Sequence, residues 1–337
     1  MFRPNTFVIG AALLGVTATS CIDTAKLGTK TTSKVLVKAQ PALKMESDYD
    51  HAARAIPGAL KTVEGFHVAY PEFKNLTGIL AEGYCQYGTG FVEDEWEIAE
   101  LIEKDFEKSA YVARRATKMF VRCMNYGLEL LGGQWPDKFT GPLDELKPLA
   151  RSAGSGQRQN LLWAAVGLAS SINMNKDDVN MIDMVGTAEW LLKRIVVMDG
   201  DGEIFKPTDP AAPWDAKAFE AEFGKKAGVP KDEVHRALPH VALGLLYTSR
   251  GEAVGGDPEQ GKRHFERAID ITGGKFLLAK VMLARNYGRI RTDREFFRQS
   301  LVEVLQTDPA IYPQQRLANE IAHRRARRYL KLEKEWF

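Results

Sequence analysis

Cysteine, net charge and long apolar stretches are all scarce in this sequence of 337 residues. Its three cysteines are too few for the disulfide framework that holds small secreted domains together. Lysine and arginine total 46 against 44 acidic residues, so the formal charge of +2 gives no reason to expect a nucleic-acid partner. Beyond the N-terminus, no segment is apolar enough to span a membrane. Hydrophobic residues still make up 45% of the chain, which is enough for an ordinary globular core.

Signals for catalysis and for cofactor binding are also missing. The sequence contains no P-loop, no dinucleotide-binding fingerprint and no nucleophile elbow. His235 and His240 are five residues apart and fall on different faces of a helix, while His264 has no cysteine or carboxylate at ligand spacing. The segment 199–203 opens like a calcium loop, but Pro210 stands where the loop needs a glutamate. We therefore expect no enzyme activity, no cofactor and no metal site.

What the sequence does contain is helical periodicity. Strand signals are nearly absent after residue 50, and apolar residues recur there at three- and four-residue spacing, which predicts an all-α protein. Four helix pairs resemble the tetratricopeptide pattern, in which small residues let two helices approach closely. The two halves of these pairs are centred near Leu80 and Phe120, Trp163 and Leu192, Leu243 and Phe265, and Leu283 and Leu301. We predict an irregular tetratricopeptide-like helix-pair solenoid over residues 49–337, closed by a terminal helix over 312–337.

Some features of this body leave alternatives open. The long connections 132–156 and 199–231 carry aromatics beside prolines, which fits flaps over a concave face and caps over exposed core equally well. The acidic run 93–97 and the arginines of 324–328 could bind partners of opposite charge, but such runs are more often solvated helix faces. Five aromatics are candidates for lining a ligand cleft, although aromatics at helical spacing more often belong to a core. They are Tyr84, Tyr87, Phe91, Trp96 and Trp163.

The N-terminus reads as an export signal. Arg3 precedes the uncharged apolar run 7–16, and small residues then lead to Cys21, so residues 1–20 are expected to be a signal peptide. The residues before Cys21 resemble a bacterial lipobox, with Ala18 where leucine is commonest, and they also satisfy an ordinary signal-peptidase site. We favour lipidation of Cys21 by palmitate-type acyl chains, which would anchor the protein. Residues 21–48 are rich in threonine and lysine with little helical periodicity, and we expect a flexible, solvated tether.

Several segments together resemble a known family over roughly residues 76–337. They are AEGYCQYGTGFVEDE (81–95), LLWAAVGLA (161–169), HFERAIDIT (264–272), TDREFFRQSLVEVL (292–305) and LANEIAHRRARRYL (317–330). The family is the T-component of tripartite ATP-independent periplasmic (TRAP) transport systems. The resemblance implies an exported, non-enzymatic bacterial lipoprotein that associates with the periplasmic substrate-binding subunit, forms a homo-oligomer and offers a cleft for a small organic or hydrophobic ligand. It brings no catalytic residues with it.

Three further questions stay open at the level of sequence. An envelope scaffold or assembly lipoprotein is the alternative function, and an enzyme built from the long connections is a more distant one. Cys85 and Cys123 fall on the two helices of the first pair; their positions favour two buried free thiols over a disulfide. Ile22 follows Cys21, with the acidic residue at Asp23, which favours the outer over the inner membrane as the site of the anchor.

Overall fold

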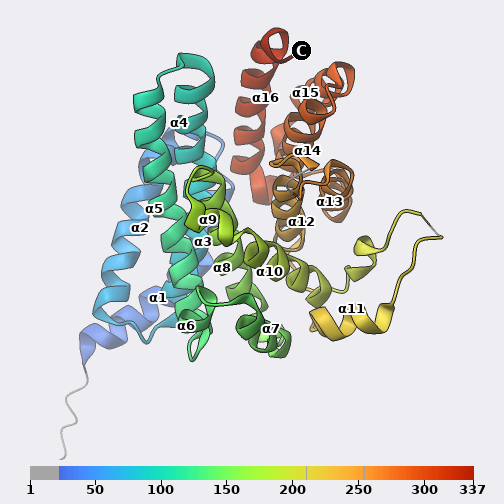
Figure 1. The fold of residues 1–337 in the computed structure, drawn as a ribbon. Helices are drawn as coiled ribbons and strands as arrows, with labels where there is room; N and C mark the ends of the chain where they lie inside the picture. The colour runs from blue at the N-terminus through green and yellow to red at the C-terminus, as the bar shows by residue number, and fades with distance from the viewer. Residues whose placement is uncertain (1–22, 210, 253–254) are drawn as a thin grey trace, which may run out of the picture.

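The computed structural model describes residues 23–209, 211–252 and 255–337. Within these ranges every regular element is helical and no strand occurs, which confirms the all-α prediction (Figure 1). The helices of the first half are α1 (Thr24–Lys44), α2 (Tyr49–Ala69), α3 (Lys74–Tyr87), α4 (Glu93–Glu97), α5 (Phe106–Leu131), α6 (Trp135–Phe139), α7 (Leu143–Ser152) and α8 (Ser155–Met174). Those of the second half are α9 (Val179–Asp183), α10 (Val185–Met198), α11 (Ala216–Phe223), α12 (Glu233–Thr248), α13 (Pro258–Ile271), α14 (Leu277–Leu283), α15 (Arg294–Gln306) and α16 (Arg316–Trp336).

The matched helix pairs pack as the small residues of the pattern require. In the pair α12 and α13, a side chain on Gly244 would meet the ring of Phe265 at 2.9 Å, so only glycine allows this approach. Between α5 and α8, a side chain on Gly167 would come within 2.7 Å of the backbone carbonyl oxygen of Phe120. Close backbone approach is thus used within one pair and between two successive pairs. Large side chains fill the remaining space, and Phe120 and Phe265 are both fully buried.

The connection between the two helices of the first pair is itself mostly helical, including the acidic run 93–97. Helix α3 continues through the π-helical turn η1 (Gly88–Val92), α4 and a second π-helical turn, η2 (Ile98–Glu103). The chain reverses only at Lys104, which has a left-handed backbone (φ 55°), and Asp105 then caps α5. This longer helical course carries the acidic residues of the segment toward the C-terminal helices.

The two long connections cover the core. Trp135 and Phe139 of α6 and Leu146 of α7 are buried in the central cluster formed by α8 and α10. In the second connection, Phe205 and Phe223 pack at the edge of the same cluster. Of the two alternatives that the sequence left open, the capping of exposed core describes these side chains, because their aromatic rings fill space between helices.

The stretch expected to be a tether contains a helix. Helix α1 occupies Thr24–Lys44, and the side chain of Asp23 caps its first turn by accepting a hydrogen bond from the Lys26 amide. The expectation of little helical structure is therefore wrong for this segment. Its inward face explains why periodicity alone missed it, because Thr29 and Ser33 are the buried positions and both are polar.

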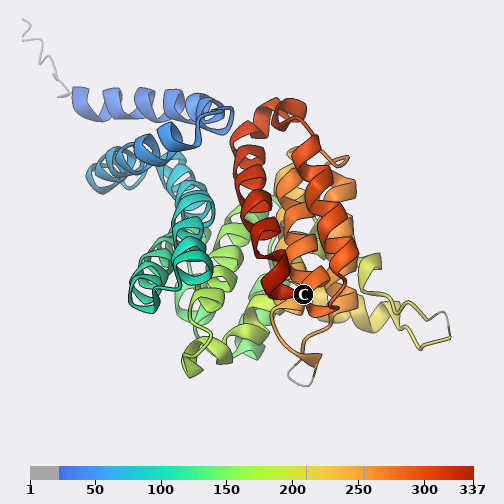
Figure 2. The same cartoon turned by 90° about the horizontal axis from the view of Figure 1, so that it is seen from above.

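The two ends of the helical array meet. Figure 2 shows the N-terminal helices and the C-terminal helices as two arms joined through α8 and α10. Helix α16 lies between the arms and contacts α1 and α2 as well as α14 and α15. A terminal closing helix was expected, and the structure adds that it closes against the beginning of the chain. This arrangement encloses a space between the arms.

Candidate functional site

A cavity of about 440 Å³ lies where α16 meets the N-terminal helices. Its walls come from α1, α2, the α3–η1 segment, α8, α12, α14 and α16, so elements from the whole length of the chain build it. The lining is predominantly apolar, and Leu36, Leu60, Val63, Val166, Leu238 and Ile321 are typical members. Its size and character match those of pockets that hold small ligands.

The five aromatic residues singled out from the sequence divide into two groups. Tyr87, Phe91 and Trp163 contribute to the cavity wall, and the rings of Tyr87 and Phe91 stack 5.6 Å apart. Tyr84 is buried elsewhere, stacked on Tyr126 at a centroid distance of 6.0 Å. Trp96 packs against the cluster of Val92, Val112 and Phe120 outside the cavity. Three of the five side chains are therefore brought together, and Tyr84 and Trp96 belong to the packing around them.

One end of the cavity carries charge. The Lys44 ammonium lies 2.5 Å from the Glu82 carboxylate, which also accepts a hydrogen bond from Gln86 (2.8 Å) and contacts His235 Nε2 (3.4 Å). Burial would raise the pKa of Glu82, but the His235 hydrogen bond and the Lys44 charge outweigh it and bring that pKa to about 2. The Trp163 ring meets the edge of the His235 ring at 5.5 Å, which positions the histidine. Lys44 and Gln86 line the cavity, and the Glu82 carboxylate, which is not itself a lining residue, holds both of these polar side chains in place.

This polar cluster was not predicted from the sequence. Glu82 lies between Ala81 and Tyr84 on the buried side of α3, and a carboxylate among inward positions was the available signal. Its partners come from α1 and α12, and no local pattern connects residues 44, 82 and 235.

A disulfide joins the first helix pair beside the cavity. Cys85 on α3 and Cys123 on α5 are bonded, with their Cα atoms 5.3 Å apart, and Cys85 also belongs to the cavity wall. Buried free thiols were expected, because Cys123 occupies an inward repeat position and Cys85 follows the packed Tyr84, and both side chains are indeed buried. The burial was correctly expected, but the two inward positions face each other across the pair, which makes a bond possible.

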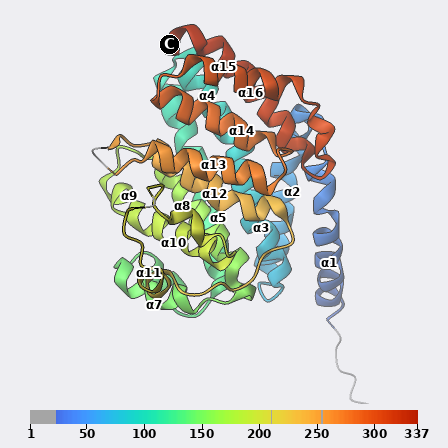
Figure 3. The same cartoon turned by 90° about the vertical axis from the view of Figure 1, so that its right-hand side faces the viewer.

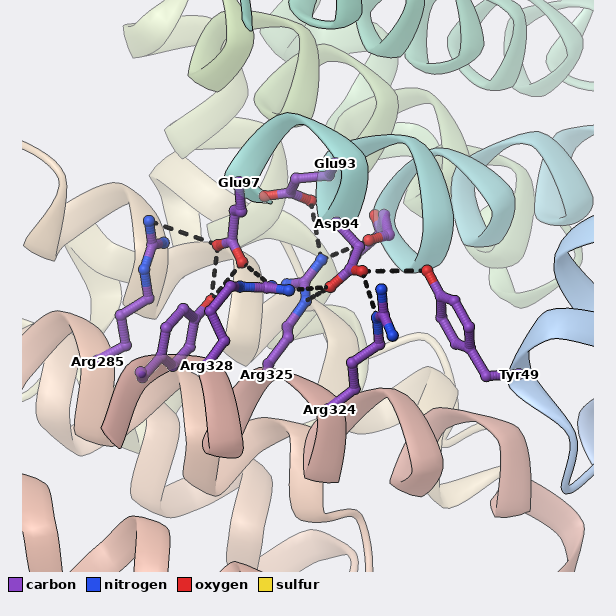
Figure 4. A network of polar contacts seen from close by, with 10 residues as sticks. Tyr49, Glu93, Asp94, Glu97, Arg285, Arg324, Arg325 and Arg328 are labelled. Carbon is purple, nitrogen blue, oxygen red and sulfur yellow. Dashed lines mark hydrogen bonds and ion pairs between the residues drawn. The ribbon is translucent and has the colours of Figure 1, made fainter. Parts of the chain in front are cut away.

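A buried ionic network lies beside the η1 turn that forms part of the cavity wall, and Figure 4 shows its residues. Asp94 accepts hydrogen bonds from Arg324 (2.8 Å) and Tyr49 (3.1 Å) and pairs with Arg328 at 2.7 Å. Glu97 pairs with Arg328 and with Arg285. We refer to these charged residues, with Arg325 and Tyr329, as the closing network. It joins α4 to α16 across more than 200 positions of sequence, and Tyr49 adds α2.

The closing network touches the cavity wall directly. Arg325 donates from Nη2 to the backbone carbonyl of Thr89 (2.5 Å), and Thr89 is a wall residue of the η1 turn. Burial would raise the pKa of Glu97, but Arg285, Arg325 and Arg328 bring it to about 2, so the carboxylate is charged. The acidic run and the arginine cluster were expected to be solvated faces. That expectation is wrong for Asp94, Glu97 and Arg325, which are fully buried and satisfy one another's charge.

A pair of histidines is buried between α12 and α13. His240 and His264 are buried, with their Nδ1 atoms 3.0 Å apart, and burial lowers the pKa of both. Asp201 lies 3.6 Å from His240 and also pairs with Arg267, while Asp199 pairs with Arg158. The carboxylates of the calcium-loop-like segment are therefore engaged with cations of the protein. Across the described ranges, no group of three or more His, Cys, Asp or Glu side chains is arranged to hold a metal ion.

Two findings bear on the class of protein. In the part of the chain that the structure describes, no helix is both long and apolar enough to cross a bilayer. The expected lipidation site, Cys21, and the expected signal peptide lie outside the described residues. The cavity walls present no nucleophile beside a base; they offer an apolar surface with a polar end, which suits binding.

Comparison with known proteins connects this arrangement to one family. The family model described as TRAP transporter T-component matches residues 45–203 and 232–337. The match takes in α2 to α10 and α12 to α16, and it leaves out α1 and the connection that contains α11. No curated protein matches the chain.

Proposed function

Since the chain belongs to the TRAP transporter T-component family, an accessory component of these transporters, we propose that it binds the periplasmic substrate-binding subunit and holds a small ligand in its cavity. The observation that carries the proposal is the apolar cavity with one polar end. An envelope scaffold, the alternative, needs no enclosed apolar space, so the cavity favours ligand handling.

The shape of the site narrows the ligand class. A body of hydrocarbon or aromatic character fits the walls of Leu60, Val63 and Ile321, since burying apolar surface drives such binding. A single polar group on that ligand would meet Lys44 and Gln86 at the charged end. We therefore propose an amphipathic small molecule, bound with its polar group toward Glu82.

Filling the cavity should abolish ligand binding. Ala318 of α16 lines the cavity, and Ala318→Phe would place a ring in the space that the ligand needs. We expect native mass spectrometry of the wild-type protein to show a co-purified small molecule. The affinity of the variant for that molecule should be lower by about 5- to 150-fold, because overpacking by the added ring costs about 1–3 kcal/mol. The same spectra read the subunit count, for which we propose a homo-oligomer.

The matched control is Ala113→Phe on α5, which adds the same ring outside the cavity. Equal occupancy in wild type and Ala318→Phe, or equal loss in both variants, would contradict a ligand role for this cavity.

We propose a location on the periplasmic side of the bacterial envelope, in the outer rather than the inner membrane, with an acyl anchor on Cys21. The supporting observations are the signal-like sequence before Cys21 and the bond between Cys85 and Cys123, because disulfides persist in oxidising compartments.

Removing the anchor should relocate the protein. We expect the wild-type chain to remain with membranes after a high-salt wash, whereas Cys21→Ser appears in the soluble fraction, because acyl chains resist salt and charge contacts do not. Ser20→Ala, which keeps the cysteine, is the control for this experiment. Salt-resistant membrane attachment of Cys21→Ser would contradict the anchor.

The proposed partner is tested separately. Crosslinking in cells, followed by capture of the wild-type protein, should recover an exported solute-binding protein. Capture without a solute-binding protein would contradict the partner.

A further inference from the structure

Helix α1 has a basic outer face. The helix contains five lysines and no acidic residue. Four of the lysines recur at four-residue intervals, which places them on one side of a helix, and all four are exposed. They are Lys26, Lys30, Lys34 and Lys38.

The same outer surface carries exposed apolar side chains. Leu27, Val35 and Val37 are 56%, 59% and 39% exposed, and each is flanked by lysines of the basic face. Exposed apolar residues are unremarkable when they are scattered, but these three lie on a single helix among cations. A helix that combines a basic face with apolar side chains is the arrangement that binds at the interface of a lipid bilayer.

The protein itself leaves most of this charge uncompensated. Lys26 pairs with Glu72 at 2.7 Å, and the Asp23 side chain caps the helix. Among the residues that the structure describes, Lys30, Lys34 and Lys38 take part in no ion pair.

The position of the helix suits a surface contact. Figure 3 shows α1 at one edge of the molecule, with its outer side turned away from the body. Its opposite side faces inward, where Thr29 and Ser33 are buried and Leu36 and Gln40 line the cavity. The family match begins at residue 45, so this helix lies outside the matched region.

We propose that the outer face of α1 binds the surface of an anionic phospholipid membrane. The lysine ammonium groups would contact lipid phosphates, while Leu27, Val35 and Val37 enter the boundary between headgroups and acyl chains. The inference goes beyond the proposed transport role and stands without the anchor at Cys21. Because the inner side of α1 forms part of the cavity wall, binding in this orientation places the cavity at the lipid surface.

Vesicle flotation tests the proposal. The full chain is used with Cys21→Ser, so that no acyl group is attached at residue 21, and residues 1–20 are the same in every variant. The probes are vesicles of phosphatidylglycerol and phosphatidylcholine mixed, and vesicles of phosphatidylcholine alone. The test variant replaces four lysines with glutamine, at Lys26, Lys30, Lys34 and Lys38. The control makes the same change of charge at four exposed lysines elsewhere, Lys118, Lys217, Lys225 and Lys231.

We expect the parent and the control to bind the anionic vesicles and to be released by salt, and the α1 variant to bind at least about tenfold more weakly, because each lysine near the surface adds to the attraction. Circular dichroism of all three proteins establishes that the helices are intact. Equal binding by the α1 variant and the control, or equal binding to neutral and anionic vesicles, would overturn the proposal. So would the absence of vesicle binding by the parent, as expected if the basic face contacts an acidic protein instead.

Discussion

Replacing Glu97 with glutamine is expected to lower the free energy of unfolding by about 3–5 kcal/mol, the cost of removing one partner from a buried ion pair. Glu97 is fully buried and is shared by Arg285, Arg328 and Tyr329. Glutamine keeps the shape and can still accept hydrogen bonds, but it removes the ion-pair partner of Arg285 and leaves Arg328 paired with Asp94 alone. Denaturant unfolding of the purified variant measures the loss.

The pH dependence of the same variant gives a second readout. The pKa of Glu97 is about 2 in the folded protein, compared with about 4.3 in an unfolded chain. A depressed folded pKa means that the carboxylate stabilises the fold above the unfolded pKa and loses that effect as the pH falls toward the folded one. The difference in free energy of unfolding between wild type and Glu97→Gln should therefore be largest near neutral pH and should shrink between about pH 4.3 and pH 2.

Glu95→Gln is the matched control, because it makes the same chemical change two residues away. Glu95 pairs with Arg115 at 2.6 Å, but both side chains are more than a third exposed, and exposed pairs contribute at most about 1 kcal/mol. Similar losses in the two variants, or a Glu97→Gln effect that does not change with pH, would show that the closing network is not a stabilising element.

Removal of the disulfide is expected to cost about 4 kcal/mol. Cys85 and Cys123 are separated by 38 positions, and a cross-link that closes a loop of this size restricts the unfolded chain by about that amount. The double substitution Cys85→Ala and Cys123→Ala removes the bond without leaving reactive thiols. We expect its denaturation midpoint to match that of the reduced wild type and to lie well below that of the oxidised wild type.

A reductant distinguishes the contribution of the disulfide bond to stability from that of the packing of the two side chains. Added dithiothreitol should lower the midpoint of the wild type and leave the double variant unchanged. If the reductant has no effect on the wild type, the thiols are not bonded in the purified protein and the structural assignment is incorrect.

Local pattern predicted much of the fold. The spacing of Leu80, Phe120, Gly244 and Phe265 placed these residues in packed helix pairs, because a 3.6-residue period records which face of a helix is buried. Helix α1 was not predicted because its buried positions are polar. The contact of α16 with α2 and α4 was not predicted either, since charge complementarity between positions 94 and 324 produces no periodic pattern in the sequence.

The candidate site was predictable only in part. Aromatic residues at inward positions pointed to Tyr87, Phe91 and Trp163, but the same pattern selected Tyr84 and Trp96, which pack outside the cavity. Helical periodicity tells inside from outside, and it does not tell a core from a cavity wall. That distinction depends on the curvature of the whole array and on α16, which are properties of the assembled fold.

The contact between α4 and α16 joins parts of the chain that are distant in sequence. Asp94 and Arg324 are 230 positions apart, and closing a loop of that length has a large entropic cost that is recovered only when the final contacts form. Since Leu317, Ala318 and Ile321 of α16 are cavity walls, a chain that lacks its last helix has an open groove in place of an enclosed space. The cavity therefore exists only after α16 has docked on helices that precede it by more than 200 positions, so local opening of α16 alone would expose its apolar walls to solvent.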